Sequence, residues 1–316
     1  IDQVRFNRVI EKTGLRVVRE FTLVPGLKLL AMPKPPAKVQ VNQQRLKRLL
    51  ATKRSLEASG LFRYVELDYV NVPFAKVTDS AFVDGTLWGL ENYGQDNGTG
   101  DADIDIEQAW DITSGTPETV VAVIDTGVRV THNDLIDQIW TNEDEIPNNG
   151  VDDDKDGYID NHKGVDFYNN DGDPNDVHGH GTHCSGTIAA SANDEHPHAG
   201  VAFNATILPC KVGDYGMPDS AIIAAVEFCV AEGVKIANCS YGGFFPSQAS
   251  YDAYAAAGTE GMMFLAAAGN DANDNDSLPA YPCSYDLECI VSVAATDRND
   301  DITGFSNYGE TAVDLG

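Results

Sequence analysis

The sequence predicts an α/β fold in which a doubly wound, mostly parallel sheet follows a smaller N-terminal α+β domain. In the second part of the chain, apolar runs of strand length alternate with helical segments, the order typical of helix-covered parallel sheets. These runs are apolar at nearly every position, as expected of strands buried on both faces. Charge also divides the chain: residues 1–77 contain 15 Lys and Arg against 6 Asp and Glu, whereas residues 78–316 contain 6 against 43. We therefore predict two domains that meet near residue 77.

The first domain is predicted to be a small α+β unit. Residues 14–32 alternate like paired strands, residues 43–59 have the pattern of a basic amphipathic helix with leucines inward, and residues 62–70 return to a strand. Residues 71–85 lack periodicity. A net charge of +9 could mark a nucleic-acid-binding arm, but the basic residues are interleaved with apolar ones and no cluster of stacking aromatics accompanies them. Attraction to the second domain, with its net charge of −37, is the better interpretation.

The second domain is predicted to alternate strands and helices. Strands are expected at residues 120–124, 206–212, 234–240, 262–270 and 289–296, and helices at residues 180–192, 220–232 and 248–257, the second of them capped by Asp219 or Ser220. No apolar run reaches the roughly 18–20 residues that cross a membrane. Cys283 and Cys289 flank a short loop and are predicted to form a disulfide in a secreted protein.

Two short motifs place an aspartate and a histidine where hydrolytic chemistry needs them. The run Val123-Ile124-Asp125-Thr126-Gly127-Val128 ends an apolar strand with a carboxylate, and His180-Gly181-Thr182-His183-Cys184-Ser185-Gly186 opens a helix. Asp125 therefore falls at the carboxyl end of a parallel strand, where open α/β sheets keep their sites. A carboxylate that orients a histidine is the acid–base pair of serine hydrolases.

Both motifs resemble those of the subtilisin-like (subtilase) family, whose catalytic triad follows the order Asp, His, Ser. The resemblance implies a subtilisin-like fold for residues 78–316 and catalytic roles for Asp125 and His180, with His183 a helix residue. It also covers the strand that ends in Gly269-Asn270, where the family places the asparagine that donates to the oxyanion. Asn270 is the expected donor. The family's Gly-Thr-Ser-Met-Ala segment is absent, so we expect the nucleophilic serine to lie beyond Gly316.

The same resemblance implies how a peptide substrate binds. The family pairs an extended substrate with segments that correspond here to residues 213–217 and to Ser240-Tyr241-Gly242-Gly243. Residues 266–269 correspond to the first specificity pocket, which gives Ala267 and Gly269 a role in substrate binding. These small residues would equally suit a plain core, although glycines after Ser240 permit close backbone approach.

Between the two motifs lies an acidic loop with the chemistry of a calcium site. Residues 152–160 carry carboxylates at positions 152, 154 and 156, followed by Gly157, and hard oxygen ligands in this spacing suit Ca²⁺. Lys163 stands where an EF-hand needs glutamate, whereas many subtilases carry a similar loop as a structural calcium site. The alternative is a solvated acidic loop. The expected ligands are Asp152, Asp154, Asp156 and Asp160; residues 169–176 are either a further ligand source or a polar turn.

These observations predict a secreted, calcium-stabilised serine endopeptidase zymogen that acts on protein or peptide substrates. Residues 1–77 would be a propeptide that docks on the catalytic domain and inhibits it, as subtilase propeptides do, and the signal peptide would be absent from this sequence. One alternative is a catalytically inactive protein that binds or inhibits peptides. Another is an acidic calcium-binding module, which leaves Asp125, His180 and Asn270 without a role.

Overall fold

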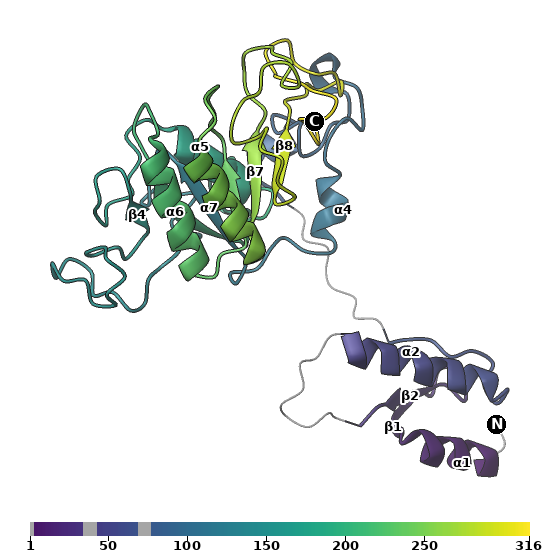
Figure 1. Ribbon diagram of the computed structural model, residues 1–316. Helices are drawn as coiled ribbons and strands as arrows, with labels where there is room; N and C mark the ends of the chain where they lie inside the picture. Colours follow the sequence, from purple (N-terminus) through teal and green to yellow (C-terminus); the bar gives the residue numbers. More distant parts are fainter. Residues whose placement is uncertain (1–2, 34–42, 69–76) are drawn as a thin grey trace. The chain divides into compact units, whose positions relative to one another are not determined.

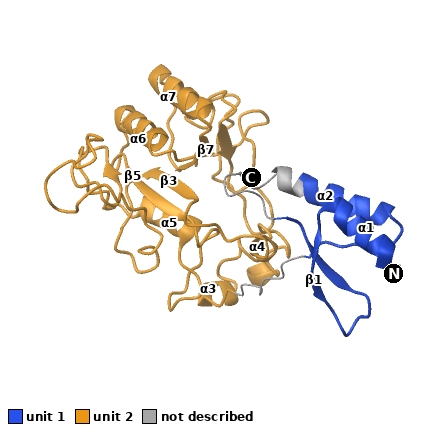
Figure 2. Cartoon of the chain, turned by 90° about the horizontal axis from the view of Figure 1, so that it is seen from below, with its two compact units in different colours: residues 1–73 blue, residues 74–316 orange. Residues whose placement is uncertain are grey.

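The computed structural model describes residues 3–33, 43–68 and 77–316. The chain forms two compact units, residues 1–73 and residues 74–316 (Figure 2). This division lies close to the change in charge along the sequence, and the segment that joins the units is outside the described residues. We describe each unit by itself.

The first unit consists of helix α1 (Gln3–Thr13), an antiparallel pair of strands, β1 (Arg16–Glu20) and β2 (Lys28–Ala31), and helix α2 (Gln43–Ala58) (Figure 1). The strand pair and α2 are confirmed, although Leu50 of α2, predicted to face inward, is exposed. No prediction was made for α1, although its residues Phe6, Val9 and Ile10 recur at helical spacing. Phe6 of α1 is buried and packs edge-on against Phe62. The predicted strand at residues 62–70 is wrong for residues 62–68, which form no strand; residues 69 and 70 lie outside the described part.

The second unit is built on a six-stranded sheet. Its strand order is β4 (Val165–Asp166), β5 (Thr206–Lys211), β3 (Val120–Asp125), β6 (Ile236–Cys239), β7 (Met263–Ala267) and β8 (Ile290–Val293), and every pair is parallel. The order changes direction beside β3, as in doubly wound sheets. The predicted fold class is confirmed. Because the strands are parallel, their carboxyl ends all lie along one edge of the sheet.

Helices cover both faces of this sheet (Figure 2). Helix α5 (His180–Ala189) lies on one face, and α6 (Asp219–Ala231) and α7 (Gln248–Thr259) lie on the other. Side chains of β3 alternate between the two cores: Ala122 and Ile124 belong to the cluster under α6 and α7, whereas Val121 and Val123 belong to the cluster on the α5 side. Strand β3 is therefore buried on both faces, as its uniformly apolar sequence predicted.

Shorter helices complete the second unit. Helix α3 (Ser80–Val83), the 3₁₀ turn η1 (Gln95–Asn97) and helix α4 (Ile106–Trp110) precede the sheet, and Trp110 packs against Phe82 and Phe203 in a separate small core. Helix α6 begins at Asp219 with Pro218 at its N-cap, so neither predicted cap residue occupies that position.

Two further expectations concern cysteines and membranes. The predicted disulfide is wrong: Cys283 and Cys289 are both free, because the Cys283 thiol is turned to the carbonyls of Ala268 and Ala280 whereas Cys289 contacts the Tyr254 carbonyl. Among the described residues, no helix has the length and apolar character that a membrane crossing requires.

Candidate active site

Asp125 is the last residue of β3 and is completely buried. Strand β3 lies between β5 and β6, and the backbone of Asp125 pairs with Lys211 of β5. The backbone N–H of Thr126 donates to Asp125 Oδ1 at 2.7 Å. Oδ2 is buried and has no hydrogen-bond partner among the described residues. The histidine beside it supplies a second donor to Oδ1, so the buried carboxylate is held through that one oxygen.

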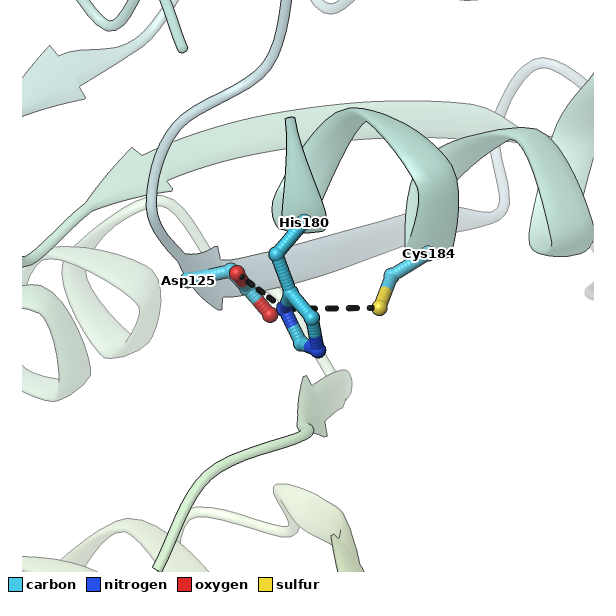
Figure 3. A group of neighbouring side chains, drawn as sticks. All are labelled: Asp125, His180 and Cys184. Atoms are coloured by element: carbon cyan, nitrogen blue, oxygen red, sulfur yellow. Dashed lines mark hydrogen bonds and ion pairs between the residues drawn. The ribbon is translucent and has the colours of Figure 1, made fainter. Parts of the chain in front are cut away.

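His180 is the first residue of α5, and its Nδ1 lies 2.7 Å from Asp125 Oδ1 (Figure 3). Because a carboxylate only accepts hydrogen bonds, Nδ1 carries the hydrogen and the neutral ring keeps a lone pair on Nε2. The His180 side chain is 42% exposed although its partner is fully buried. The pair therefore presents a proton acceptor at the surface with a fixed carboxylate behind it.

Cys184 lies one helical turn after His180, with its Sγ 3.9 Å from His180 Nδ1 (Figure 3). Burial, and next the charge of Asp125, raise the pKa of the Cys184 thiol to about 11. The thiol is therefore un-ionised at neutral pH. Only the thiolate is a strong nucleophile, so Cys184 is not activated by its neighbours.

Glycines allow α5 to begin directly against the end of β3. A side-chain Cβ at Gly181 would lie 2.2 Å from the carbonyl oxygen of Gly127 and 3.0 Å from the Asp125 Cβ. Gly127 itself has a φ of +100°, and a Cβ there would lie 2.4 Å from the Pro174 carbonyl oxygen. Gly127 and Gly181 are thus required by close backbone approach, and this approach sets the separation of Asp125 and His180.

Asp176 fastens the two motifs together, a role that sequence reasoning missed. Its Oδ1 accepts hydrogen bonds from the Thr126 hydroxyl and from the backbone N–H groups of His178 and Gly179, and its Oδ2 accepts two from Thr182. Burial alone would raise the pKa of Asp176, but these hydrogen bonds outweigh it and lower the pKa. The carboxylate therefore joins the end of β3 to the first turn of α5. The available signal was its position, two and three residues before backbone donors, as in Asx turns.

The segments expected to bind substrate follow β6 and β7 at the same edge of the sheet. Ser240 exchanges hydrogen bonds with Asn238, and Gly243 pairs with Tyr281 through two backbone hydrogen bonds. Tyr241 is half-buried, whereas Gly242, Gly243 and Ala267 are exposed.

Asn270 is exposed after Gly269, where the chain turns sharply. Gly269 has a φ of +119°, and a Cβ there would lie 2.3 Å from the Asn307 side-chain nitrogen. The buried Asn307 accepts hydrogen bonds from the N–H groups of Asp271 and Asn273 and donates to the Ala268 carbonyl. This support fixes the backbone on both sides of Asn270 and leaves its amide facing solvent.

The acidic loop gathers carboxylates between β3 and β4. Oxygen atoms of Glu145, Asp152 and Asp154 all lie within 4.8 Å of one another. Glu145 is buried, and Asp152 Oδ1 is buried without a hydrogen-bond partner. Glu145 was not among the expected ligands, although the acidic run at residues 143–145 preceded the loop as a signal. An orphaned carboxylate oxygen inside a group of three like charges fits a site for a hard cation.

Hydrogen bonds within the loop engage most of its carboxylates. Glu145 accepts from the N–H groups of Asp153, Asp154 and Asp160, and Asp154 accepts from the Asn142 amide. The Asp156 carboxylate accepts hydrogen bonds from the Tyr158 N–H and the Asn161 amide, and Asp160 accepts from the N–H groups of Asn149 and Gly150. Burial, with the negative charges of Asp154 and Asp152 adding to it, raises the pKa of Asp156. The loop thus carries unfavourable negative charge that a bound cation would offset.

Comparison with known proteins identifies the wider group to which these features belong. Residues 116–315 match the subtilase family. The chain is 33% identical over 208 residues to thermitase of Thermoactinomyces vulgaris, covering 65% of this chain and 64% of thermitase. It is 31% identical over 267 residues to a thermophilic serine proteinase of Bacillus sp. (strain AK1), covering 84% of this chain and 57% of that protein. The chain thus spans less than two thirds of the length of either relative.

A solved structure agrees with the sequence relatives. A protease from Pseudoalteromonas arctica PAMC 21717 superposes with a TM-score of 0.56 at 27% sequence identity, over 76% of this chain and 71% of that one.

Proposed function

Because this chain belongs to the subtilase family of serine proteases, we propose that it hydrolyses peptide bonds as a serine endopeptidase. The observation that carries the proposal is the 2.7 Å hydrogen bond between His180 Nδ1 and the buried carboxylate of Asp125, at the carboxyl edge of the sheet. An imidazole oriented in this way can accept a proton through Nε2 from an attacking hydroxyl and return it to the leaving amine. Asp125 stays ionised and stabilises the imidazolium.

The proposal assigns the remaining catalytic parts as follows. The nucleophilic serine lies outside the 316 residues, since they contain no Ser-Met-Ala run. Asn270 is the side-chain donor to the oxyanion that forms when the substrate carbonyl is attacked, and its exposure at the sheet edge supports this role. Ser240, Tyr241, Gly242 and Gly243 bind the substrate backbone, and Ala267 and Gly269 line the first specificity pocket.

Calcium is the proposed structural cofactor. Glu145, Asp152 and Asp154 would hold it, because their oxygens converge and Asp152 Oδ1 has no other partner. Asp156 and Asp160 complete the proposed acidic set and also organise the loop backbone. A bound calcium ion would offset part of the loop's negative charge.

We propose further that the protein is a zymogen secreted from the cell. The match to the Bacillus sp. (strain AK1) proteinase covers 84% of the chain and so extends into residues 1–77. A basic propeptide on an acidic protease domain supports inhibition by docking. A calcium-stabilised fold suits extracellular fluid, where calcium ions are plentiful.

The test measures hydrolysis of a fluorogenic peptide by the full-length natural protein that contains these 316 residues. His180→Ala should lower kcat/KM by at least about 10⁴-fold, with the calcium-dependent melting temperature unchanged. His183→Ala, on the exposed side of the same helix, is the matched control and should retain activity. Unchanged activity in His180→Ala would refute the assignment. Peptide binding without any hydrolysis in the unsubstituted protein would favour an inactive peptide-binding protein.

A further inference from the structure

A cavity of about 380 Å³ lies beside the proposed substrate-binding segments. It is lined by the loop after β5, at residues 215–217, by the segment after β6, at residues 241–243, and by residues of α6 and α7. Six of its lining residues are aromatic: Tyr215, Tyr241, Phe245, Tyr254, Tyr281 and Tyr285.

Ring contacts connect this cavity with the catalytic histidine. The Tyr215 ring lies 5.3 Å from the His178 ring, which lies 6.3 Å from the His180 ring. On the opposite wall, the backbone of Gly243 pairs with Tyr281. A peptide bound along Ser240 to Gly243 would therefore pass the cavity mouth on its way to His180. The inference rests on the proposed function for this peptide path.

Two polar side chains in the cavity, the exposed Asp219 and the buried Ser250, have no hydrogen-bond or ion-pair partner among the described residues. Asp219 lines it from the first residue of α6, and no described cation forms an ion pair with its carboxylate. Ser250 lines it from α7; it is 4% exposed, and its hydroxyl oxygen has no hydrogen bond. In contrast, the hydroxyls of Tyr241 and Tyr254 bond to each other at 2.8 Å.

The Asp219 charge acts on the aromatic wall. Burial raises the pKa of the Tyr285 hydroxyl, and among neighbouring charges Asp219 raises it further. The Tyr285 hydroxyl is itself occupied, because it donates to the Ser247 carbonyl and accepts from the Ser247 N–H. Asp219 and Ser250 therefore remain as the groups that can receive hydrogen bonds from an incoming side chain.

We propose that this cavity binds a lysine or arginine side chain of the peptide substrate, N-terminal to the bond that is cut. The aliphatic stem would lie against the tyrosine rings, the cation would be attracted by their faces, and the carboxylate of Asp219 and the hydroxyl of Ser250 would accept its hydrogen bonds. The net charge of −37 over residues 78–316 draws cationic peptides to the same surface. A norleucine or phenylalanine side chain would fill the space and leave both polar groups unpartnered.

The experiment measures kcat/KM of the full-length protein for a fluorogenic peptide series. Each position N-terminal to the cleaved bond carries lysine, norleucine, phenylalanine or glutamate in turn, since norleucine has the stem of lysine without its charge. At one position, lysine should be preferred over norleucine by about tenfold, and Asp219→Asn should reduce that ratio by about fivefold. Raising the NaCl concentration should also reduce the ratio.

Glu227→Gln is the matched control, because it removes one negative charge from the exposed side of α6 without touching the cavity. It should leave the lysine-to-norleucine ratio unchanged. Ser250→Ala, checked by its melting temperature, should lower the ratio without loss of folding.

The possible results separate the two proposals. The cavity assignment would be overturned if norleucine or phenylalanine is preferred at every position. It would also be overturned if Asp219→Asn leaves the lysine-to-norleucine ratio of kcat/KM unchanged. In both cases the proposed protease function would stand. If no peptide is cleaved, the proposed function fails. The lysine-to-norleucine ratio is then obtained from the dissociation constants of labelled peptides, measured by fluorescence anisotropy. Equal dissociation constants for the lysine and norleucine peptides would overturn the cavity assignment.

Discussion

At the scale of single residues, the geometry of the Asp125–His180 pair argues against Cys184 as the nucleophile. Cys184 stands close enough to His180 to suggest a thiol nucleophile. However, His180 Nδ1 is already engaged with Asp125, and a thiol with a pKa of about 11 holds its proton at neutral pH. The geometry suits an attacking group on the other side of the ring, at Nε2.

Asp176 should stabilise the fold and position His180 without touching substrate. Asp176→Asn replaces one acceptor oxygen with an amide nitrogen, so the two Thr182 hydrogen bonds lose their acceptor. We expect a loss of about 1–3 kcal/mol in the free energy of unfolding at pH 7, measured by urea denaturation. The loss of activity should appear in kcat more than in KM.

The pH dependence of this effect has a defined sign. The folded pKa of Asp176 lies below its ordinary value of 3.8, so its stabilisation is complete at pH values above the unfolded pKa and disappears as the pH falls through the folded one. The stability difference between the natural protein and Asp176→Asn should therefore shrink below pH 3.8. Asp173→Asn, in the exposed part of the same loop, should change stability by less than about 0.5 kcal/mol. A pH-independent difference would contradict this role for Asp176.

At the scale of elements, the acidic loop should depend on calcium for its order. Removing the ion with EDTA should lower the melting temperature by about 5–10 °C, if calcium at saturation contributes about 2.7 kcal/mol. In Glu145→Gln the buried member of the carboxylate group is neutral, so most of this calcium-dependent rise should be lost. Differential scanning calorimetry with and without calcium measures both quantities.

Glu143→Gln is the matched control for the loop, because Glu143 is exposed and lies outside the carboxylate group. It should keep the full calcium-dependent rise. An equal rise in Glu145→Gln would place the calcium elsewhere.

Sequence reasoning succeeded with elements whose apolar pattern is local. Strand β3 and helices α6 and α7 were predicted because their own residues fill the core. Strand β4 has only two residues and is defined by its pairing with β5. It is too short for a pattern of apolar residues to predict it. Within the site, Asp125 and His180 stand in recognisable motifs, whereas Glu145 and Asp176 acquire their roles from backbone N–H groups that folding brings to them. Any residue except proline can supply a backbone N–H group, so these hydrogen bonds cannot be predicted from residue types.

At the scale of the whole molecule, the proposal that residues 1–77 are an inhibitory propeptide predicts that the division of charge governs their release. The full-length protein should show a lag before activity appears in low salt, and 1 M NaCl should shorten it, because the Debye length then falls to about 3 Å. Lys47→Glu with Arg48→Glu, both exposed on α2, should shorten the lag in low salt. Fluorogenic hydrolysis followed over time measures the lag. In 1 M NaCl the variant and the natural protein should behave alike; a lag indifferent to both salt and charge would contradict electrostatic docking.

The close approach of Gly181 to the Gly127 carbonyl affects how the proposed activity would be lost on damage. At Gly181 the helix start meets the Gly127 carbonyl backbone to backbone, and side-chain hydrogen bonds through Thr126 and Asp176 join the same two segments. Asp125 and His180 are consequently held in register before any peptide arrives. We therefore expect that damage to this contact lowers the fraction of molecules that are active. The kcat of each molecule that remains folded should stay unchanged.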